Sequence, residues 1–222
     1  MKNIHKKINN FVIIGDSYST FTGYNPDGYE VYYDGTREPY IERVEDTWWH
    51  LYKTKTNSSL VLNDSWSGST ICYTGRRSPE YGYRSSFVNR MHLMIKDDFF
   101  RKNNIDTVFI FGGTNDSWLD ETPKGELQFS DWKEEDLYST LPAISYMISK
   151  LKEELQGGNV IFIINTELDP RISDAVKLSS ERFGTTYVEL EDIDKFSGHP
   201  TVKGMKEICE QVYMTTHKGK IL

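Results

Sequence analysis

The chain has 222 residues, with 26 Lys and Arg against 33 Asp and Glu, which gives a net charge of −7. The length favours a single domain, and an acidic chain whose basic residues cluster only in pairs is not expected to bind nucleic acid or anionic membranes. The two cysteines have neither metal-ligand nor disulfide-framework spacing. Because the N-terminal segment also lacks the apolar core of a signal peptide, we expect a cytoplasmic protein.

Five short apolar runs, each bounded by polar or glycine residues, predict buried strands of a parallel sheet. In chain order they cover residues 11–14, 60–62, 108–111, 160–164 and 186–190.

Segments with helical periodicity lie between most of these runs and after the last one. They cover residues 48–52, 87–95, 137–155 and 202–212. Pro142 falls inside the third segment, so that helix either begins near Thr140 or kinks there. The alternation of strands and helices predicts an α/β protein with helices on both faces of the sheet.

We predict one domain over residues 1–222, with an aromatic-rich insertion at about 18–45. This insertion follows the first strand, and a second long connection follows the third strand at Thr114. Open α/β sheets bind their ligands at the carboxyl ends of the strands, so we expect both connections to belong to a functional site.

Polar and glycine residues follow three of the predicted strands and precede the last helix. The segments are Gly15-Asp16-Ser17, residues 63–68, residues 112–116 and Gly198-His199. A serine nucleophile needs a base within hydrogen-bonding reach and donors directed at the oxyanion that forms on attack. Ser17 is the candidate nucleophile and His199 the candidate base. The backbone N–H groups of Ser17 and Gly68 and the side-chain amide of Asn115 are candidate oxyanion donors.

Taken singly, each of these residues has an ordinary structural interpretation. Ser17 can cap a turn, Gly68 can be a turn glycine, Asn115 can form an Asx turn, and His199 can precede a helix capped by Thr201. Their occurrence together at one sheet edge favours the chemical interpretation.

With these four segments in this order, the sequence resembles the GDSL or SGNH hydrolase family from Phe11 to the last helix. The residues that match the family name are Ser17, Gly68, Asn115 and His199. The resemblance implies a flavodoxin-like three-layer sandwich whose five-stranded parallel sheet has the order 2-1-3-4-5. It also implies no metal and no cofactor, and hydrolysis of a small-molecule ester through an acyl-enzyme at Ser17.

The chain departs from the family where an aspartate normally stands three residues before the histidine, because that position is Phe196. Asp194 is the candidate third catalytic residue, provided that the backbone turns it towards His199. Alternatively, a backbone carbonyl accepts the Nδ1 proton and fixes the tautomer of His199.

Further side chains near these segments have expected supporting roles. Asp16 and Asp116 are expected to brace the site loops by hydrogen bonds rather than to form a glycosidase pair. Trp66, Trp118 and Tyr18 are candidate substrate contacts, and the two tryptophans can stack on a sugar ring or pack as part of the wall or core. Many aromatic residues fall in the loops at this edge, which predicts an aromatic-walled pocket over Ser17.

The leading hypothesis is a serine esterase for a small acyl ester, with an O-acetyl group on a carbohydrate as one substrate. The alternative is a flavodoxin-like module that binds FMN or a small ligand without hydrolysis, since the segment after the first strand is rich in hydroxyl and aromatic groups. That segment is not followed promptly by a helix that would bind phosphate. The sequence leaves the oligomeric state open, a homo-oligomer included.

Overall fold

The computed structural model describes residues 7–217. Its central sheet has five parallel strands in the order β2-β1-β3-β4-β5, which confirms the predicted α/β topology. The strands are β1 (Asn10–Gly15), β2 (Ser59–Ser65), β3 (Thr107–Phe111), β4 (Asn159–Ile164) and β5 (Thr186–Glu189).

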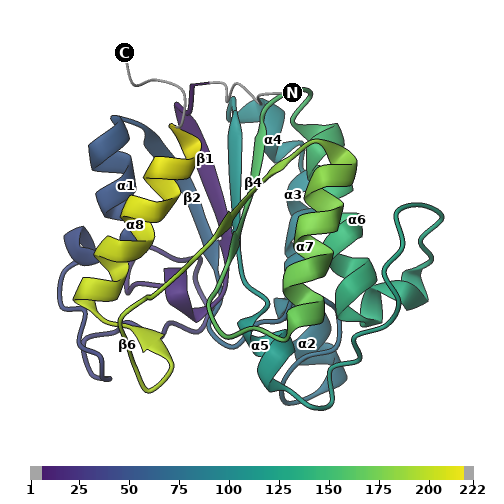
Figure 1. Cartoon of the computed structure of the whole chain (residues 1–222), viewed down its shortest axis with the longest axis horizontal. Helices are drawn as coiled ribbons and strands as arrows, with labels where there is room; N and C mark the ends of the chain where they lie inside the picture. Colours follow the sequence, from purple (N-terminus) through teal and green to yellow (C-terminus); the bar gives the residue numbers. More distant parts are fainter. Residues whose placement is uncertain (1–6, 218–222) are drawn as a thin grey trace.

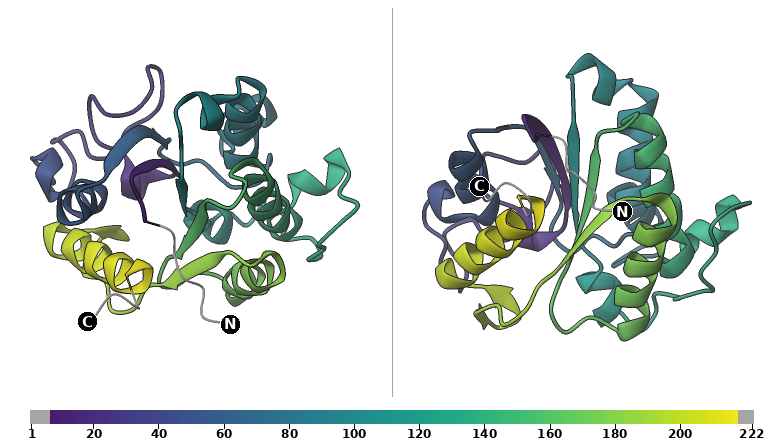
Figure 2. Two further views of the ribbon diagram at one scale, coloured as in Figure 1. Left: turned by 90° about the horizontal axis from the view of Figure 1, so that it is seen from above. Right: turned by 45° about the horizontal axis from the view of Figure 1, so that its top comes forward.

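Helices cover both faces of the sheet (Figures 1 and 2). One face carries α1 (Trp48–Thr56) and α8 (Val202–Thr216). The other carries α3 (Phe87–Lys96), α6 (Thr140–Glu154) and α7 (Pro170–Phe183). The three central strands β1, β3 and β4 are buried on both sides, and alternate β1 side chains pack into two separate cores. The result is the three-layer sandwich that the sequence predicts.

The central elements follow the predicted pattern with two informative differences. α6 begins at Thr140, which is the first of the two predicted alternatives and places Pro142 in the first helical turn, where its missing N–H breaks no helical bond. The first difference is that β2 continues to Ser65, so the polar residues 63–65 lie on the strand rather than after it. α7 is absent from the prediction because its buried stripe is narrow and rich in small residues, although Asp169 and Pro170 are a helix start signal.

The remaining elements are short, and several gather at the carboxyl edge of the sheet, the lower end in Figure 1. Gly15 pairs with both Ser65 and Phe111, so these three strand ends are level. None of the described helices is long and apolar enough to cross a membrane. The short elements are η1 (Ser17–Ser19), η2 (Val44–Asp46), α2 (Pro79–Ser85), α4 (Phe99–Lys102), α5 (Thr114–Trp118), η3 (Glu134–Tyr138), β6 (Lys195–Phe196) and β7 (His199–Pro200).

Candidate active site

Ser17 and His199 meet at the carboxyl edge of the sheet, although 182 positions separate them in the sequence. The Oγ atom of Ser17 lies 3.0 Å from Nε2 of His199. Ser17 begins η1 immediately after β1, and Gly15 allows this turn because a Cβ there would lie 2.6 Å from Oγ of Ser65. The sharp exit from a buried strand therefore presents the hydroxyl to the imidazole.

His199 stands on a two-stranded hairpin formed by β6 and β7. Its Nδ1 atom lies 3.4 Å from the carbonyl oxygen of Ser197. The ring of Tyr32 stacks on the imidazole at a centroid distance of 3.5 Å and an interplanar angle of 3°. The phenol of Tyr18 donates a hydrogen bond to the carbonyl of Gly198, which ties the hairpin to the segment after β1. Main-chain and ring contacts thus set the position of His199.

Burial lowers the pKa of His199 from 6.5 to about 4. The hydrogen bond to the Ser197 carbonyl opposes this effect, and the positive charges of Lys195, Arg76 and Arg37 add to it. The imidazole is therefore neutral at neutral pH, which is the form that can accept a proton from a serine hydroxyl.

Asp194 does not contact His199 in this structure. Its Oδ2 atom accepts a hydrogen bond from the Thr201 hydroxyl, and Oδ1 lies 4.0 Å from Nζ of Lys203. Among residues 7–217, the hydrogen-bonding partners of the imidazole are the Ser17 hydroxyl and the Ser197 carbonyl. The geometry therefore matches the alternative in which a backbone carbonyl orients His199, because the Asp194 carboxylate instead binds Thr201, the N-cap residue of α8.

The three candidate oxyanion donors line one pocket with Ser17 and His199. The backbone N–H groups of Ser17 and Gly68 donate no hydrogen bond to another described residue. Gly68 has a φ of +79°, a conformation that L side chains rarely adopt. The side-chain amide of Asn115 donates to the Ser69 carbonyl at 2.9 Å, and its second N–H has no acceptor among residues 7–217.

Two buried carboxylates support the loops around these donors. Asp116 accepts hydrogen bonds from the backbone N–H groups of Ile71 at 2.9 Å and Cys72 at 3.5 Å, which anchors the segment after Gly68. Asp16 caps η1 by accepting from the Tyr18 N–H at 3.1 Å. Burial raises the pKa of Asp16 to about 7; the Tyr18 N–H opposes the shift and the charge of Asp116 adds to it.

A buried arginine that the sequence analysis does not identify links several of these segments. The Nη1 atom of Arg90 lies 2.7 Å from the Asp64 carboxylate. Its Nη2 atom donates to the Gly15 carbonyl at 3.0 Å and the Ser69 hydroxyl at 3.3 Å, and Nε donates to the Ser85 carbonyl at 2.9 Å. Arg90 therefore connects the ends of β1 and β2 with the Gly68 loop. An arginine in an amphipathic helix segment carries no sequence signal for this role.

The pocket over Ser17 has a volume of about 460 Å³. Trp118 lines it with 46% of its surface exposed, and its ring lies 6.3 Å from that of His199. The lining residues are Ser17, Glu30, Tyr32, Arg37, Ser67, Gly68, Arg76, Arg77, Tyr81, Asn115, Trp118 and His199.

The structure does not bring the other two predicted substrate contacts into this lining. Trp66 is buried, stacks on Tyr29 at 4.1 Å and donates from Nε1 to the Tyr81 hydroxyl. Tyr18 is buried behind His199. The wall is therefore only partly aromatic, with three rings from Tyr32, Tyr81 and Trp118. The arginines and Glu30 come from the same loops, but exposed charged residues in long loops give no sequence signal for a pocket.

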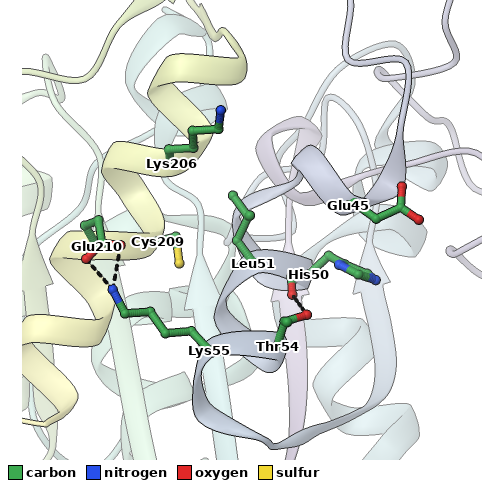
Figure 3. A pocket seen from close by; sticks show the side chains of 8 residues that line it. All are labelled: Glu45, His50, Leu51, Thr54, Lys55, Lys206, Cys209 and Glu210. Atoms are coloured by element: carbon green, nitrogen blue, oxygen red, sulfur yellow. Dashed lines mark hydrogen bonds and ion pairs between the residues drawn. The ribbon is translucent and has the colours of Figure 1, made fainter.

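A second pocket of about 350 Å³ lies between α1 and α8, away from Ser17 (Figure 3). Lys55 and Glu210 form an ion pair at 2.5 Å within its lining. The Cys209 thiol is protonated at neutral pH because burial raises its pKa to about 11, so it is a poor nucleophile. In the described part of the chain, no three His, Cys, Asp or Glu side chains are grouped to hold a metal ion.

A family model described as GDSL-like lipase/acylhydrolase matches residues 9–216 of the chain. The chain is also similar to a protein from Bacteroides ovatus described as a GDSL-like lipase, with 35% identity and a TM-score of 0.84, over 96% of this chain and 100% of that one. A second such protein, from Bacteroides uniformis, has 35% identity and a TM-score of 0.82, over 93% and 94% of the two chains.

More distant structures share the fold. A family two carbohydrate esterase from Clostridium thermocellum has 18% identity and a TM-score of 0.60, over 95% of this chain and 65% of that one. The comparison with curated proteins found no match.

Proposed function

We propose, from the premise that this chain belongs to the GDSL-like lipase/acylhydrolase family and is a carboxylic ester hydrolase, that Ser17 is its nucleophile and His199 its general base. The observation that carries the proposal is the 3.0 Å contact between Ser17 Oγ and His199 Nε2 in a pocket shared with Gly68 and Asn115. Membership of this family argues against the alternative of an FMN-binding module without hydrolase activity.

In the proposed mechanism, His199 accepts the Ser17 proton as Oγ attacks the ester carbonyl carbon. The resulting oxyanion accepts hydrogen bonds from the Ser17 and Gly68 N–H groups and from the Asn115 amide. Collapse of this intermediate breaks the bond to the alcohol, which leaves with the proton from His199. Water then attacks the acyl group on Ser17 by the same steps in reverse order and releases the carboxylic acid.

The Ser197 carbonyl is proposed to take the place of the usual aspartate. A proton on Nδ1 can be donated to this carbonyl, which leaves the lone pair of Nε2 facing Ser17. A neutral carbonyl stabilises the imidazolium less than a carboxylate would, so it offsets only part of the lowering of the His199 pKa by burial.

The pocket lining supports a small acyl group and a polar alcohol. No aliphatic side chain lines the pocket within the described chain, and a long acyl chain would need such a surface. The exposed ring of Trp118 offers a flat face on which a pyranose can stack. We therefore propose an O-acetyl group on a carbohydrate as the finer substrate assignment, with Trp118 contacting the sugar.

Hydrolysis of 4-nitrophenyl acetate and 4-nitrophenyl octanoate by the wild type, Ser17→Ala and the exposed-site control Ser130→Ala tests this proposal. We expect the wild type and the control to prefer the acetate, and Ser17→Ala to lose about 10³-fold or more in kcat. Full activity in a folded Ser17→Ala variant would refute the nucleophile, and a preference for octanoate would refute the small-acyl assignment.

A further inference from the structure

The lining of the site pocket carries an excess of positive charge, whereas the whole chain has a net charge of −7. Three arginines, Arg37, Arg76 and Arg77, line the pocket with one carboxylate, Glu30. Clefts lined by one sign of charge concentrate ligands of the opposite sign. The pocket over Ser17 is therefore locally positive, although the chain as a whole is negative.

Two of these arginines are held by partners within the loops. The Nη1 atom of Arg77 lies 2.5 Å from Oε1 of Glu30, and its guanidinium lies 4.6 Å from the ring centre of Tyr81. The Nε atom of Arg37 lies 3.8 Å from the Asp34 carboxylate. Because each has a carboxylate partner, neither supplies a fully uncompensated charge.

Arg76 differs from both. Within residues 7–217 it makes no ion pair and no hydrogen bond, yet its side chain lines the pocket. Its Cδ atom lies 3.7 Å from the position that a Cβ on Gly68 would occupy. Its positive charge also reaches His199, where it contributes to the lowered pKa. An uncompensated guanidinium therefore stands beside the proposed oxyanion donors.

A guanidinium presents planar, paired N–H donors that match the two oxygens of a carboxylate. On the basis of the proposed esterase function, we propose that the substrate is an ester that also carries a carboxylate, and that Arg76 binds this group while Ser17 attacks the ester. Arg37 and Arg77 contribute further positive charge to the lining of the same pocket. Arg76 thus acts as a specificity-determining residue, and an acidic O-acylated sugar meets both this requirement and the stacking surface of Trp118.

Three chromogenic esters test the assignment: neutral 4-nitrophenyl acetate, mono-4-nitrophenyl succinate with the carboxylate on the acyl part, and 3-carboxy-4-nitrophenyl acetate with it on the alcohol part. Each kcat/KM is divided by the rate constant for hydroxide-catalysed hydrolysis, which removes differences in intrinsic reactivity. We expect at least one acidic ester to exceed the neutral ester by about tenfold, the effect of one charged contact. The identity of the faster acidic ester shows whether the substrate carries its carboxylate on the acyl part or on the alcohol part. The preference for the acidic ester should decrease as salt is added.

Arg76→Gln should remove this preference, because kcat/KM for the preferred acidic ester should fall about tenfold more than kcat/KM for the neutral ester. Arg76→Lys should retain part of the preference. Arg182→Gln, at an exposed position on α7, is the matched control for loss of one positive charge. Equal losses for all three esters in Arg76→Gln would overturn the proposal, because they would indicate a role at the oxyanion or at His199. A neutral ester hydrolysed as well as both acidic ones by the wild type would also overturn it. Esterase activity that depends on Ser17 but shows no acid preference would leave the proposed function intact.

Discussion

The two halves of the proposed active site, the oxyanion donors and the histidine, are held by different kinds of interaction. On the oxyanion half, the Gly68 loop is fixed by fully buried charged groups, with Asp116 accepting from backbone N–H groups and Arg90 linking two strand ends to that loop. On the histidine half, His199 lies on a two-stranded hairpin beside a stacked Tyr32 and a main-chain carbonyl. We therefore expect substitutions that disturb the donor loop to affect stability more than substitutions of His199.

Replacing Arg90 should destabilise the oxyanion half more than any of the other substitutions. Arg90→Met leaves the buried Asp64 carboxylate without its positively charged partner, and we expect a loss of about 3–5 kcal/mol in the free energy of unfolding. Urea denaturation measures this loss. Arg101→Met, which removes an exposed ion pair with Asp98, is the control and should leave the transition midpoint almost unchanged. Similar midpoints for the two variants would mean that the buried network does not hold this half together.

Removing one donor should reduce catalysis more than stability. We expect Asn115→Ala to lower kcat by about 10²–10³-fold, because one oxyanion hydrogen bond is lost. Steady-state kinetics with 4-nitrophenyl acetate measures the loss, and urea denaturation of the same variant separates it from unfolding. A folded variant with less than a few-fold loss would remove Asn115 from the oxyanion site.

The histidine half predicts an unusual pH profile. Only neutral His199 can accept the Ser17 proton, and its pKa is lowered to about 4, so kcat/KM should stay near its neutral value at pH 5 and fall only as the pH decreases through about 4. A histidine with the ordinary pKa of 6.5 would already have lost about thirtyfold at pH 5. Circular dichroism at each pH controls for unfolding. An acid limb near 6.5 would contradict the buried, neutral imidazole.

The smallest expected effect concerns Asp194. Because its carboxylate binds Thr201 and Lys203 rather than His199, Asp194→Asn should change kcat by no more than about threefold, while His199→Ala should lose about 10³-fold or more. Parallel kinetics of the two variants make the comparison. Equal, near-complete losses in folded proteins would show that Asp194 completes a triad on the histidine half.

The position of the proposed oxyanion donors is easier to predict from the sequence than the orientation of His199, for a physical reason. Buried strands have continuous apolar runs, and Ser17, Gly68 and Asn115 follow three of them directly, so their meeting at one sheet edge follows from topology. The partner of His199 is a backbone carbonyl, which every residue possesses and no motif marks.

Side-chain direction in the loops is the other part that the sequence does not specify. Trp66 and Trp118 have similar positions relative to the site segments, yet Trp66 packs between Tyr29 and Tyr81 and only Trp118 lines the pocket. The long segment after β1 has no periodicity that would show which rings point inward. α7 is also missing from the prediction, because its stripe of small buried residues gives only a weak helical pattern in the sequence.

The central claim, that Ser17 is activated by His199, is tested most directly by covalent labelling. A 4-nitrophenyl alkylphosphonate forms a stable P–O bond with an activated serine and releases 4-nitrophenolate. We predict one equivalent of 4-nitrophenolate from the wild type, with the label on the peptide that contains Ser17, and little reaction with Ser17→Ala or His199→Ala. A label on another residue, or equal labelling of the folded variants, would contradict the account.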